Sequence, residues 1–444
     1  MIPDCFFDPG SIALVGAAHT DIKLGGIVLK NLLRFKGKVY PVNPKYNELM
    51  GLKAYASVEA LPDSVDLAVI MRPAPEVPDI LHQFKNKTTC AIVVSSGFAE
   101  VGETGLQDEV KRVGRETGIR IVGPNCMGVC NPSKRLDTFF LTYERMKRPR
   151  KGNVAVVSQS GALLICLFEV IKAWNIGLSK AIGYGNAVDI DVSDIFEYLS
   201  QDRATDVVIS YIESVGDGRR FVESAKELSG KKSLVILKSG KGLSGQVAAY
   251  SHTGRLAGKY EVFHSVLQQF GIPEARDLDE LVDATKALSY QMPVKGNRVC
   301  ILTNGGGAGV LAADECMRQG LEIARLPEDK IKRLREMFPH FYGINNPLDL
   351  TAQVQDKEYL QVLEELHDDY DGFLIIAMAG VQGVSERLAD LIKDFQVRTP
   401  KPLVFYTTLN TVSMRLKSLL EKARIPVFPS PERAIRGLRA LLRQ

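Results

Sequence analysis

The sequence lacks long apolar runs and any strong excess of charge. No run of about 18 apolar residues occurs, so we expect no membrane-spanning helix. The formal net charge is only +4 over 444 residues, which gives no electrostatic footprint for nucleic acid. The first residues, MIPDCFFDPGS, lack the basic and apolar regions of a secretory signal. We therefore expect a cytoplasmic protein that binds neither membrane nor nucleic acid.

Cysteine is scarce and scattered. The seven cysteines are Cys5, Cys90, Cys126, Cys130, Cys166, Cys300 and Cys316. An odd number in mostly apolar surroundings predicts buried free thiols in a reducing compartment, not disulfides. Cys126 and Cys130 have no second Cys or His pair at matching spacing, so no metal site is expected.

What the chain does contain is a repeated pattern of apolar strand, small polar turn and helix. At about 150 residues per domain, this length predicts three domains. Strands that alternate with helices predict α/β domains built on parallel sheets. Linkers are expected near 147–151 and 292–295. The predicted domains are therefore 1–145, 150–292 and 295–444.

The sequence of the first domain is typical of a mononucleotide-binding domain. Its five expected strands end in turns after Val15, Val42, Ile70, Val94 and Val122. In a parallel sheet these turns lie on one edge, where ligands bind.

The dinucleotide motif is incomplete in this domain. Gly-x-Gly-x-x-Gly is absent, since Gly16 is followed by Ala17 and the Gly25-Gly26 pair comes late. Where NAD would need an acidic residue, the chain has Asn43-Pro44-Lys45. A lysine suits a phosphate, which favours a phosphorylated adenosine such as coenzyme A. A lysine merely solvated after a proline turn is the alternative.

The second domain opens with an expected strand, 152–157, that runs into Ser158-Gln159-Ser160-Gly161 and a helix. Free N–H groups and the helix dipole at such a point favour an anion. A simple helix cap by one of the serines is the alternative.

A histidine follows later in this domain. Ser251-His252-Thr253-Gly254 lies in a stretch of small residues and glycines, 238–258. A neutral imidazole can act as a nucleophile, and Glu213 at the end of strand 207–212 is expected to orient it. An incidental surface His252 and a Glu213 that caps a helix are the alternatives.

The third domain repeats the opening of the second. The expected strand 296–302 leads into Thr303 and then a glycine-rich turn before a helix. That turn consists of Asn304, Gly305, Gly306, Gly307 and Ala308, followed by Gly309. Consecutive glycines allow close backbone approach to an anion. No Gly-Lys-Ser/Thr follows, so this is not a Walker loop.

Taken in order, these motifs resemble those of the alpha subunit of ADP-forming acetyl-CoA synthetases, also called ADP-forming acetate–CoA ligases. More distantly, they resemble succinyl-CoA synthetase alpha subunits. The resemblance covers essentially the whole chain. The matching motifs are Gly16-Ala17-Ala18, Val42-Asn43-Pro44-Lys45, Gly123-Pro124-Asn125-Cys126-Met127-Gly128, Ser158-Gln159-Ser160-Gly161, Tyr211-Ile212-Glu213-Ser214, Ser251-His252-Thr253-Gly254 and Asn304-Gly305-Gly306-Gly307-Ala308-Gly309.

The resemblance implies a Rossmann-like CoA-binding domain followed by two flavodoxin-like, doubly wound domains. It implies that His252 becomes phosphohistidine, supported by Glu213, and that the helices starting at 158 and 304 grip the phosphate. The residues implied around coenzyme A are Gly16, Ala17, Ala18, His19, Thr20, Lys45, Ser95, Ser96, Gly97, Asn125 and Cys126.

The resemblance also implies partners. No ATP-grasp domain lies in the 444 residues, so ADP or ATP and Mg²⁺ are expected on a beta subunit in an α2β2 heterotetramer. The chain departs from the family pattern at Arg255 and Lys259-Tyr260, which leaves the acyl preference open. The implied reaction converts acyl-CoA, ADP and phosphate to an acid, CoA and ATP. A catalytically silent CoA-binding regulatory module is the alternative, and an NAD-linked dehydrogenase is disfavoured.

Overall fold

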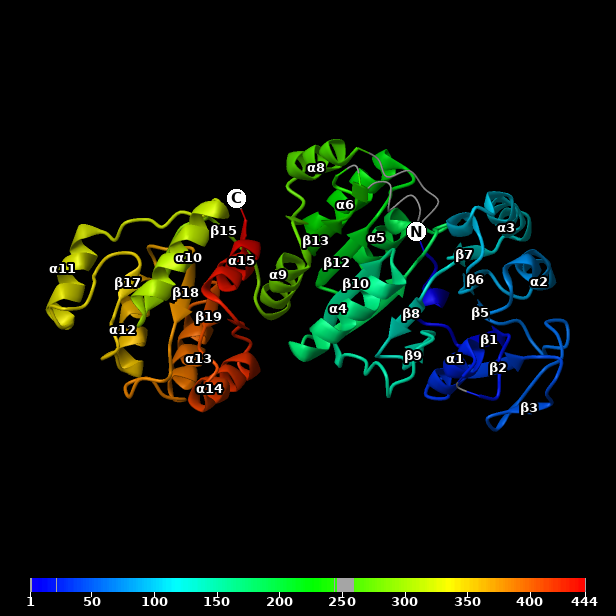
Figure 1. The fold of residues 1–444 in the computed structure, drawn as a ribbon, viewed down its shortest axis with the longest axis horizontal. Coiled ribbons are helices and arrows are strands. Elements are labelled where there is room, and N and C mark those ends of the chain that lie inside the picture. The colour runs from blue at the N-terminus through cyan, green and yellow to red at the C-terminus, as the bar shows by residue number, and fades with distance from the viewer. Residues whose placement is uncertain (1, 21, 243, 246–258, 444) are drawn as a thin grey trace. The chain divides into compact units, whose positions relative to one another are not determined.

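The computed structural model describes residues 2–20, 22–242, 244–245 and 259–443 (Figure 1). The chain divides into two compact units, Met1–Arg276 and Asp277–Gln444. Each unit contains a parallel sheet with helices packed on it, as the alternation of strands and helices predicts. No helix in the described part of the chain combines the length and apolarity needed to cross a bilayer.

The first sheet of the first unit has the order β2-β1-β5-β6-β7, and all its pairs are parallel. β1, β5 and β6 are buried almost throughout, as strands covered on both faces must be. This confirms the expected strands. The bounds are β1 Ser11–Val15, β2 Lys38–Val42, β5 Leu67–Ile70, β6 Cys90–Val93, β7 Arg120–Val122, α1 Leu24–Leu32, α2 Val77–Gln83 and α3 Thr104–Thr117, with the short hairpin β3 Glu48–Leu49 and β4 Leu52–Lys53.

The second sheet of this unit has the order β14-β13-β12-β10-β11-β8-β9. Its central strands are parallel, whereas β8 pairs antiparallel with β11 and β9 antiparallel with β8. The bounds are β8 Gly128–Asn131, β9 Leu136–Asp137, β10 Lys151–Ser158, β11 Leu178–Gly183, β12 Val207–Ile212, β13 Ser233–Lys238, β14 Glu274–Ala275, α4 Gly161–Ala173, α5 Val192–Gln201, α6 Gly218–Lys231 and α8 Tyr260–Gln269.

The hairpin β8–β9 lies within the expected first domain, 1–145, yet it extends the second sheet. The hydrophobic core is also continuous between the two sheets, from Leu14 and Val69 to Val157 and Ile236. The two sheets therefore form one compact unit. Whether the predicted segments 1–145 and 150–292 each fold alone remains a prediction.

The second unit contains a sheet of order β17-β16-β18-β19-β20, again parallel. The bounds are β15 Val294–Lys295, β16 Val299–Thr303, β17 Leu348–Asp349, β18 Gly372–Ile376, β19 Leu403–Tyr406, β20 Val427–Phe428, β21 Leu442–Arg443, α9 Leu278–Tyr290, α10 Gly306–Arg318, α11 Glu328–Met337, α12 Asp356–Leu366, α13 Leu388–Arg398, α14 Thr411–Lys422 and α15 Pro431–Leu441.

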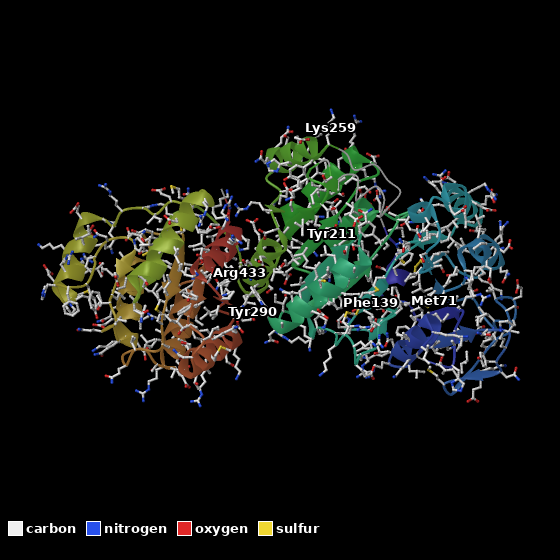
Figure 2. All side chains as sticks on the ribbon, viewed as in Figure 1. Met71, Phe139, Tyr211, Lys259, Tyr290 and Arg433 are labelled. Carbon is white, nitrogen blue, oxygen red and sulfur yellow. A yellow bond between two sulfur atoms is a disulfide. The ribbon has the colours of Figure 1, made fainter. Side chains whose placement is uncertain are left out.

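Helix α9 belongs to this second unit, although the sequence places it in the segment 150–292. Two ion pairs, each with one buried partner on α9, hold it there. Lys286 Nζ lies 2.6 Å from Glu421 Oε1, and Arg433 lies 2.8 Å from Asp283 Oδ1. Figure 2 labels Tyr290 at the end of α9 and Arg433 on the neighbouring helix α15. These contacts join residues more than a hundred positions apart, which no local pattern indicates.

The expectation of free, buried thiols is wrong for three cysteines. Cys5 and Cys90 form a disulfide, because the N-terminal segment folds back against the start of β6. Cys166 is free but exposed. The other cysteines, Cys126, Cys130, Cys300 and Cys316, are free and buried as expected. The two bonded residues are 85 positions apart, so their pairing depends on tertiary structure alone.

Candidate active site

The turn after β1 packs directly against the start of helix α1. Gly16 has a φ of +89°, and a Cβ atom there would lie 2.5 Å from the carbonyl oxygen of Met71. Cβ atoms at Gly25 and Gly26 would overlap the carbonyl oxygens of Gly16 and Thr20. Glycine permits this approach because it has no side chain. The turn after β1 and the start of α1 are therefore packed backbone against backbone, with Gly25 and Gly26 buried at the contact.

The turn after β2 is tied to this surface. Asn43 Nδ2 donates to the carbonyl oxygen of Ala17 at 2.7 Å, and Asn43 Oδ1 accepts from the backbone N–H of Lys45 at 2.9 Å. The rings of His19 and Tyr46 make an edge-to-face contact with centroids 6.5 Å apart. Along the predicted set, Gly16 is half-buried, Ala17 and Ala18 are buried, and His19, Thr20 and Lys45 are exposed.

The turns after β6 and β7 meet each other. The backbone N–H of Asn125 donates to the carbonyl oxygen of Ser95 at 2.8 Å, and Ser95 Oγ donates to the carbonyl oxygen of Arg72 at 2.5 Å. Ser96 is exposed, and Gly97 adopts a φ of +108°. The predicted residues at the ends of these strands therefore lie at one edge of the sheet.

Cys126 differs from the other predicted cofactor contacts. It is buried, and its Sγ donates to the carbonyl oxygen of Val93 at 3.2 Å. Burial raises the pKa of its thiol to about 12. The sulfur thus makes a structural contact, and a role for Cys126 in cofactor binding stays a prediction.

Asn186 is a residue of this edge that the sequence reasoning missed. It is buried in the loop between β11 and α5, and its Nδ2 donates to Glu100 Oε2 at 2.6 Å and to Gln107 Oε1 at 2.9 Å. Its Oδ1 accepts from Asn125 Nδ2 at 3.3 Å. Asn186 thereby links the second sheet to the turns of the first. No local motif indicates it, because its partners lie at least 61 residues away in sequence.

Gln159 organises the start of helix α4. Its Oε1 accepts from the backbone N–H groups of Glu213 at 2.9 Å and Ser214 at 3.0 Å, and its Nε2 donates to Ser214 Oγ at 3.1 Å. The predicted turn after β10 is therefore bonded to the predicted turn after β12. The structure brings these two candidate motifs together at the carboxyl end of the sheet.

Both serines of this turn have local roles. Ser158 Oγ donates to the carbonyl oxygen of Ser160 at 2.7 Å, and Ser160 Oγ caps α4 by accepting from Leu163 N at 3.4 Å. Ser160 is therefore a helix cap, and its part in an anion site stays a prediction. Gly161 is half-buried and Ala162 is exposed, so the first N–H groups of α4 remain near the surface.

Glu213 is buried beside a lysine. Lys238 Nζ donates to the carbonyl oxygen of Glu213 at 2.7 Å and also to that of Ser239. Burial lowers the pKa of Lys238 to about 8. Burial raises the pKa of Tyr211, and hydrogen bonding with Glu213 adds to the rise. Tyr211, labelled in Figure 2, thus sits on β12 next to this acid–lysine pair. Sequence reasoning missed Lys238, although it ends the strand that precedes the His252 segment.

His252, with the rest of 246–258, lies outside the described residues. Its pairing with Glu213 therefore stays a prediction. The residues on either side of this segment are tied to one carboxylate. Tyr260 OH donates to Glu274 Oε1 at 3.0 Å, His264 Nδ1 lies 2.6 Å from Glu274 Oε2, and Lys241 Nζ lies 3.6 Å from Glu274 Oε1. Tyr260, part of the departure at Lys259-Tyr260, thus donates to Glu274, a half-buried glutamate that the sequence reasoning missed.

The glycine-rich turn of the second unit leads into α10. Asn304 is buried and bonded to the backbone of Met378 through both its Oδ1, at 2.8 Å, and its Nδ2, at 3.3 Å. Gly305 is half-buried, Gly306 and Gly307 are exposed, and Ala308 is buried. A Cβ at Gly306 would lie 2.8 Å from Asp349 Oδ2, so a carboxylate borders this turn. The turn belongs to a different unit from Ser158, and their action on one phosphate stays a prediction.

Comparison with known proteins gives matches along the chain. Residues 10–132 match the CoA binding domain, residues 151–288 the succinyl-CoA ligase like flavodoxin domain, and residues 299–370 the Ligase-CoA domain. The chain is 38% identical over 452 residues to the alpha subunit of ADP-forming acetate–CoA ligase II of Pyrococcus furiosus, which covers 99% of this chain and 97% of that protein. The ADP-forming acetate–CoA ligase of Methanocaldococcus jannaschii is 37% identical over 97% of this chain, which spans 61% of that longer protein.

A solved structure agrees over the whole fold. The dinucleotide forming acetyl-coenzyme A synthetase 1 of Candidatus Korarchaeum cryptofilum, in complex with phosphate and ADP, superposes with a TM-score of 0.91 at 35% identity. The match covers 99% of this chain and 96% of the other. The expected fold, a CoA-binding domain followed by flavodoxin-like domains, is confirmed. Identity above 30% over nearly the full length places the chain in a family, and the chain belongs to the ADP-forming acetate–CoA ligases.

Proposed function

We propose that this chain works as the alpha subunit of an ADP-forming acyl-CoA synthetase, with acetyl-CoA as the default substrate. The reaction is acyl-CoA + ADP + phosphate ⇌ acid + CoA + ATP. The observation that carries the proposal is the Gln159 hydrogen-bond set. It places the buried Glu213 beside the start of α4, where an anion and an imidazole would both be stabilised.

Coenzyme A would bind at the carboxyl edge of the first sheet. The start of α1, held against the turn after β1 by the close approach at Gly25 and Gly26, would present its first N–H groups to a phosphate of the cofactor. The exposed Lys45 would hold a second phosphate as a point charge. The turn of Ser95, Ser96 and Gly97, with Asn125, would border the pantetheine end.

On this chain the chemistry would proceed in two steps, acyl transfer to phosphate and then phosphoryl transfer to His252. A phosphate oxygen attacks the thioester carbonyl, the C–S bond breaks, and CoA leaves as the thiol with a proton, giving an acyl phosphate. Nε2 of His252 then takes the phosphoryl group and the carboxylate leaves. The carboxylate of Glu213 would accept a hydrogen bond from Nδ1–H of His252. The proton would then stay on Nδ1, and Nε2 would be free to attack. The helix starts at Ser158 and Asn304 would stabilise the moving charge, since phosphoryl transfer depends on positioning and electrostatics.

A third step, transfer of the phosphoryl group from Nε2 of His252 to a terminal oxygen of ADP to give ATP, would occur on a partner. We assign ADP, ATP and Mg²⁺ to a beta subunit with an ATP-grasp fold, in a cytoplasmic α2β2 heterotetramer. The magnesium would neutralise the nucleotide phosphates.

The test is phosphoryl labelling of the isolated chain. Incubation with acetyl-CoA and radioactive phosphate should give a label that is stable to base and labile to acid. His252→Ala should carry no label, and Glu213→Gln should be labelled more slowly. An unlabelled wild type, or equal label on His252→Ala, would overturn the proposal. The alternative of a silent regulatory module is not favoured, because the relatives matched over nearly the whole chain are named as ligases.

A further inference from the structure

A small basic pocket lies in the first unit, at the end of helix α1 opposite to the cofactor turn. Its volume is about 400 Å³, and its walls include Arg34, Arg135, Arg148, Tyr143 and Cys130. Sites for small molecules in proteins have volumes of roughly 300–1,000 Å³. The pocket is therefore large enough for a small metabolite, and it shares no residue with the candidate active site.

Two arginines stack on one tyrosine in this pocket. The Cζ atom of Arg34 lies 4.1 Å from the ring centroid of Tyr143, and that of Arg148 lies 4.8 Å from the same centroid. Both distances are within the range of cation–π contacts. The stacking holds the guanidinium of Arg34 in place on the pocket wall, although its side chain is exposed to solvent.

The innermost arginine is fully occupied by the protein. Arg148 Nε donates to Asp137 Oδ2 at 2.9 Å, and its terminal nitrogens donate to the carbonyl oxygens of Leu141, at 2.8 Å, and Met146. The side chains of Arg148 and Asp137 are 5% and 1% exposed. Arg148 and Asp137 therefore form the buried base of the pocket. Because Arg148 already donates to protein acceptors, a ligand would be bound by the outer arginines.

Arg34 and Arg135 are those outer arginines. Both are exposed, and neither guanidinium has a hydrogen-bond or ion-pair partner among the residues that the structure describes. Three guanidiniums and one carboxylate, that of Asp137, give the pocket a net charge of +2, from +3 and −1. Burial raises the pKa of Tyr143 to about 12 and that of Cys130 well above its usual value, so both side chains stay neutral.

We infer that this pocket binds a small oxyanion with two or more negative charges, of the phosphate or polycarboxylate class. The planar fork of a guanidinium matches such oxygens bidentately. The pocket also includes Arg148 and Pro149 of the segment near 147–151, which the sequence predicts as a linker. The inference goes beyond the proposed reaction, because none of the pocket's lining residues belongs to the turns at Ser158 and Asn304.

The test is titration of the full chain with inorganic pyrophosphate and, separately, with citrate, at about 50 mM salt to limit screening. Hydrogen–deuterium exchange localises the binding. We expect peptides within 130–149 to become protected by at least one of the two anions. Arg34→Gln and Arg135→Gln should each raise the Kd at least about tenfold, the loss expected for one charged hydrogen-bonding group.

Arg203→Gln is the matched control, because Arg203 is exposed in the same unit and takes no part in the pocket. It should bind like the wild type. Protection of residues 130–149 by pyrophosphate alone would identify the phosphate class, and protection by citrate alone the polycarboxylate class. No protection of this segment by either anion would overturn the inference. So would unchanged binding in folded Arg34→Gln and Arg135→Gln, or an equal loss in Arg203→Gln. A variant's fold is checked by circular dichroism, and acyl-CoA labelling serves as an independent readout of the catalytic site.

Discussion

Gln159 shows how one side chain can define a site. Its amide satisfies two backbone N–H groups at the end of β12 while its own backbone N–H donates to the carbonyl oxygen of Tyr211 at 3.1 Å. The start of α4 and the position of Glu213 are therefore set by the same buried residue. A buried N–H that loses its acceptor costs roughly 1–3 kcal/mol.

Replacing Gln159 by Leu should consequently lower the free energy of unfolding by roughly 2–4 kcal/mol. The two N–H groups of Glu213 and Ser214 would be left without an acceptor. Thermal or urea unfolding measures the loss. Gln268→Leu on the exposed face of α8 is the control and should change stability little. A Gln159→Leu protein as stable as the wild type would show that the pair finds other acceptors.

Lys238 predicts a pH dependence of stability. Burial lowers its pKa from 10.5 to about 8, so between these values the unfolded chain binds more protons than the folded chain. Stability from this group should therefore rise as the pH goes from about 8 to 10.5, by roughly 3 kcal/mol in total, and its destabilising effect should be full below pH 8.

The measurement is urea unfolding of the wild type and Lys238→Met across this pH range. The difference between the two proteins isolates the lysine, because the other titrating groups are shared. The wild type should gain stability relative to the variant as the pH rises. A difference that stays constant with pH would contradict the assigned shift.

At the scale of elements, helix α1 is set by two glycines that the sequence shows only as a late, incomplete motif. The helix start lies so close to the turn after β1 that Gly25 and Gly26 cannot carry a Cβ without a shift of backbone. The position of this helix, more than any single side chain, shapes the proposed cofactor edge.

Gly26→Ala should therefore push α1 away from the turn and weaken CoA binding at least about tenfold, as expected when a backbone approach is lost. Calorimetric titration with CoA checks this. Gly105→Ala is the control, because a Cβ at Gly105, in helix α3, meets no atom within 4 Å. Alanine there should leave binding unchanged and stabilise the helix by roughly 0.5–1 kcal/mol. Equal CoA affinity in both variants would refute the role given to α1.

Glu274, in β14, is bonded to Lys241 in the loop after β13 and to Tyr260 and His264 of α8. Glu274→Ala should release helix α8 and speed hydrogen–deuterium exchange of residues 260–269. Glu223→Ala, an exposed acid on α6, is the comparison and should leave the exchange of that segment as it is. Unaltered exchange in Glu274→Ala would mean that the packing of Leu267 alone holds the helix.

Sequence reasoning is most accurate where physical signals are local. Runs of apolar residues predict the end of β1 at Val15 and the span of β12, 207–212, closely. The contacts that shape the sites are not local. Asn186, Glu274 and the Cys5–Cys90 pair depend on which strand edges meet, and that is decided by the packing of the whole unit.

At the scale of the molecule, the second unit begins with α9. The buried face of α15, which includes Ile435 and Leu438, packs in this unit together with α9, and Asp283 pairs with Arg433. A fragment 277–444 should thus unfold cooperatively, whereas 295–444 should bind a hydrophobic dye and melt at a lower temperature, because it exposes that face and leaves Arg433 without Asp283. Calorimetry of the two fragments checks this. Equal melting temperatures would indicate that α9 does not stabilise the second unit and belongs to the preceding domain.

The hairpin β8–β9 also bears on how such proteins can be rearranged in evolution or by protein engineers. The chain that leaves the first sheet at β7 contributes two edge strands to the next sheet before the apparent linker is reached. A recombination that swaps cofactor modules between relatives would therefore need its crossover between Val122 and Gly128. A junction at 145–151 would instead pair β8 and β9 of one protein with β11 of the other, at the edge of the second sheet.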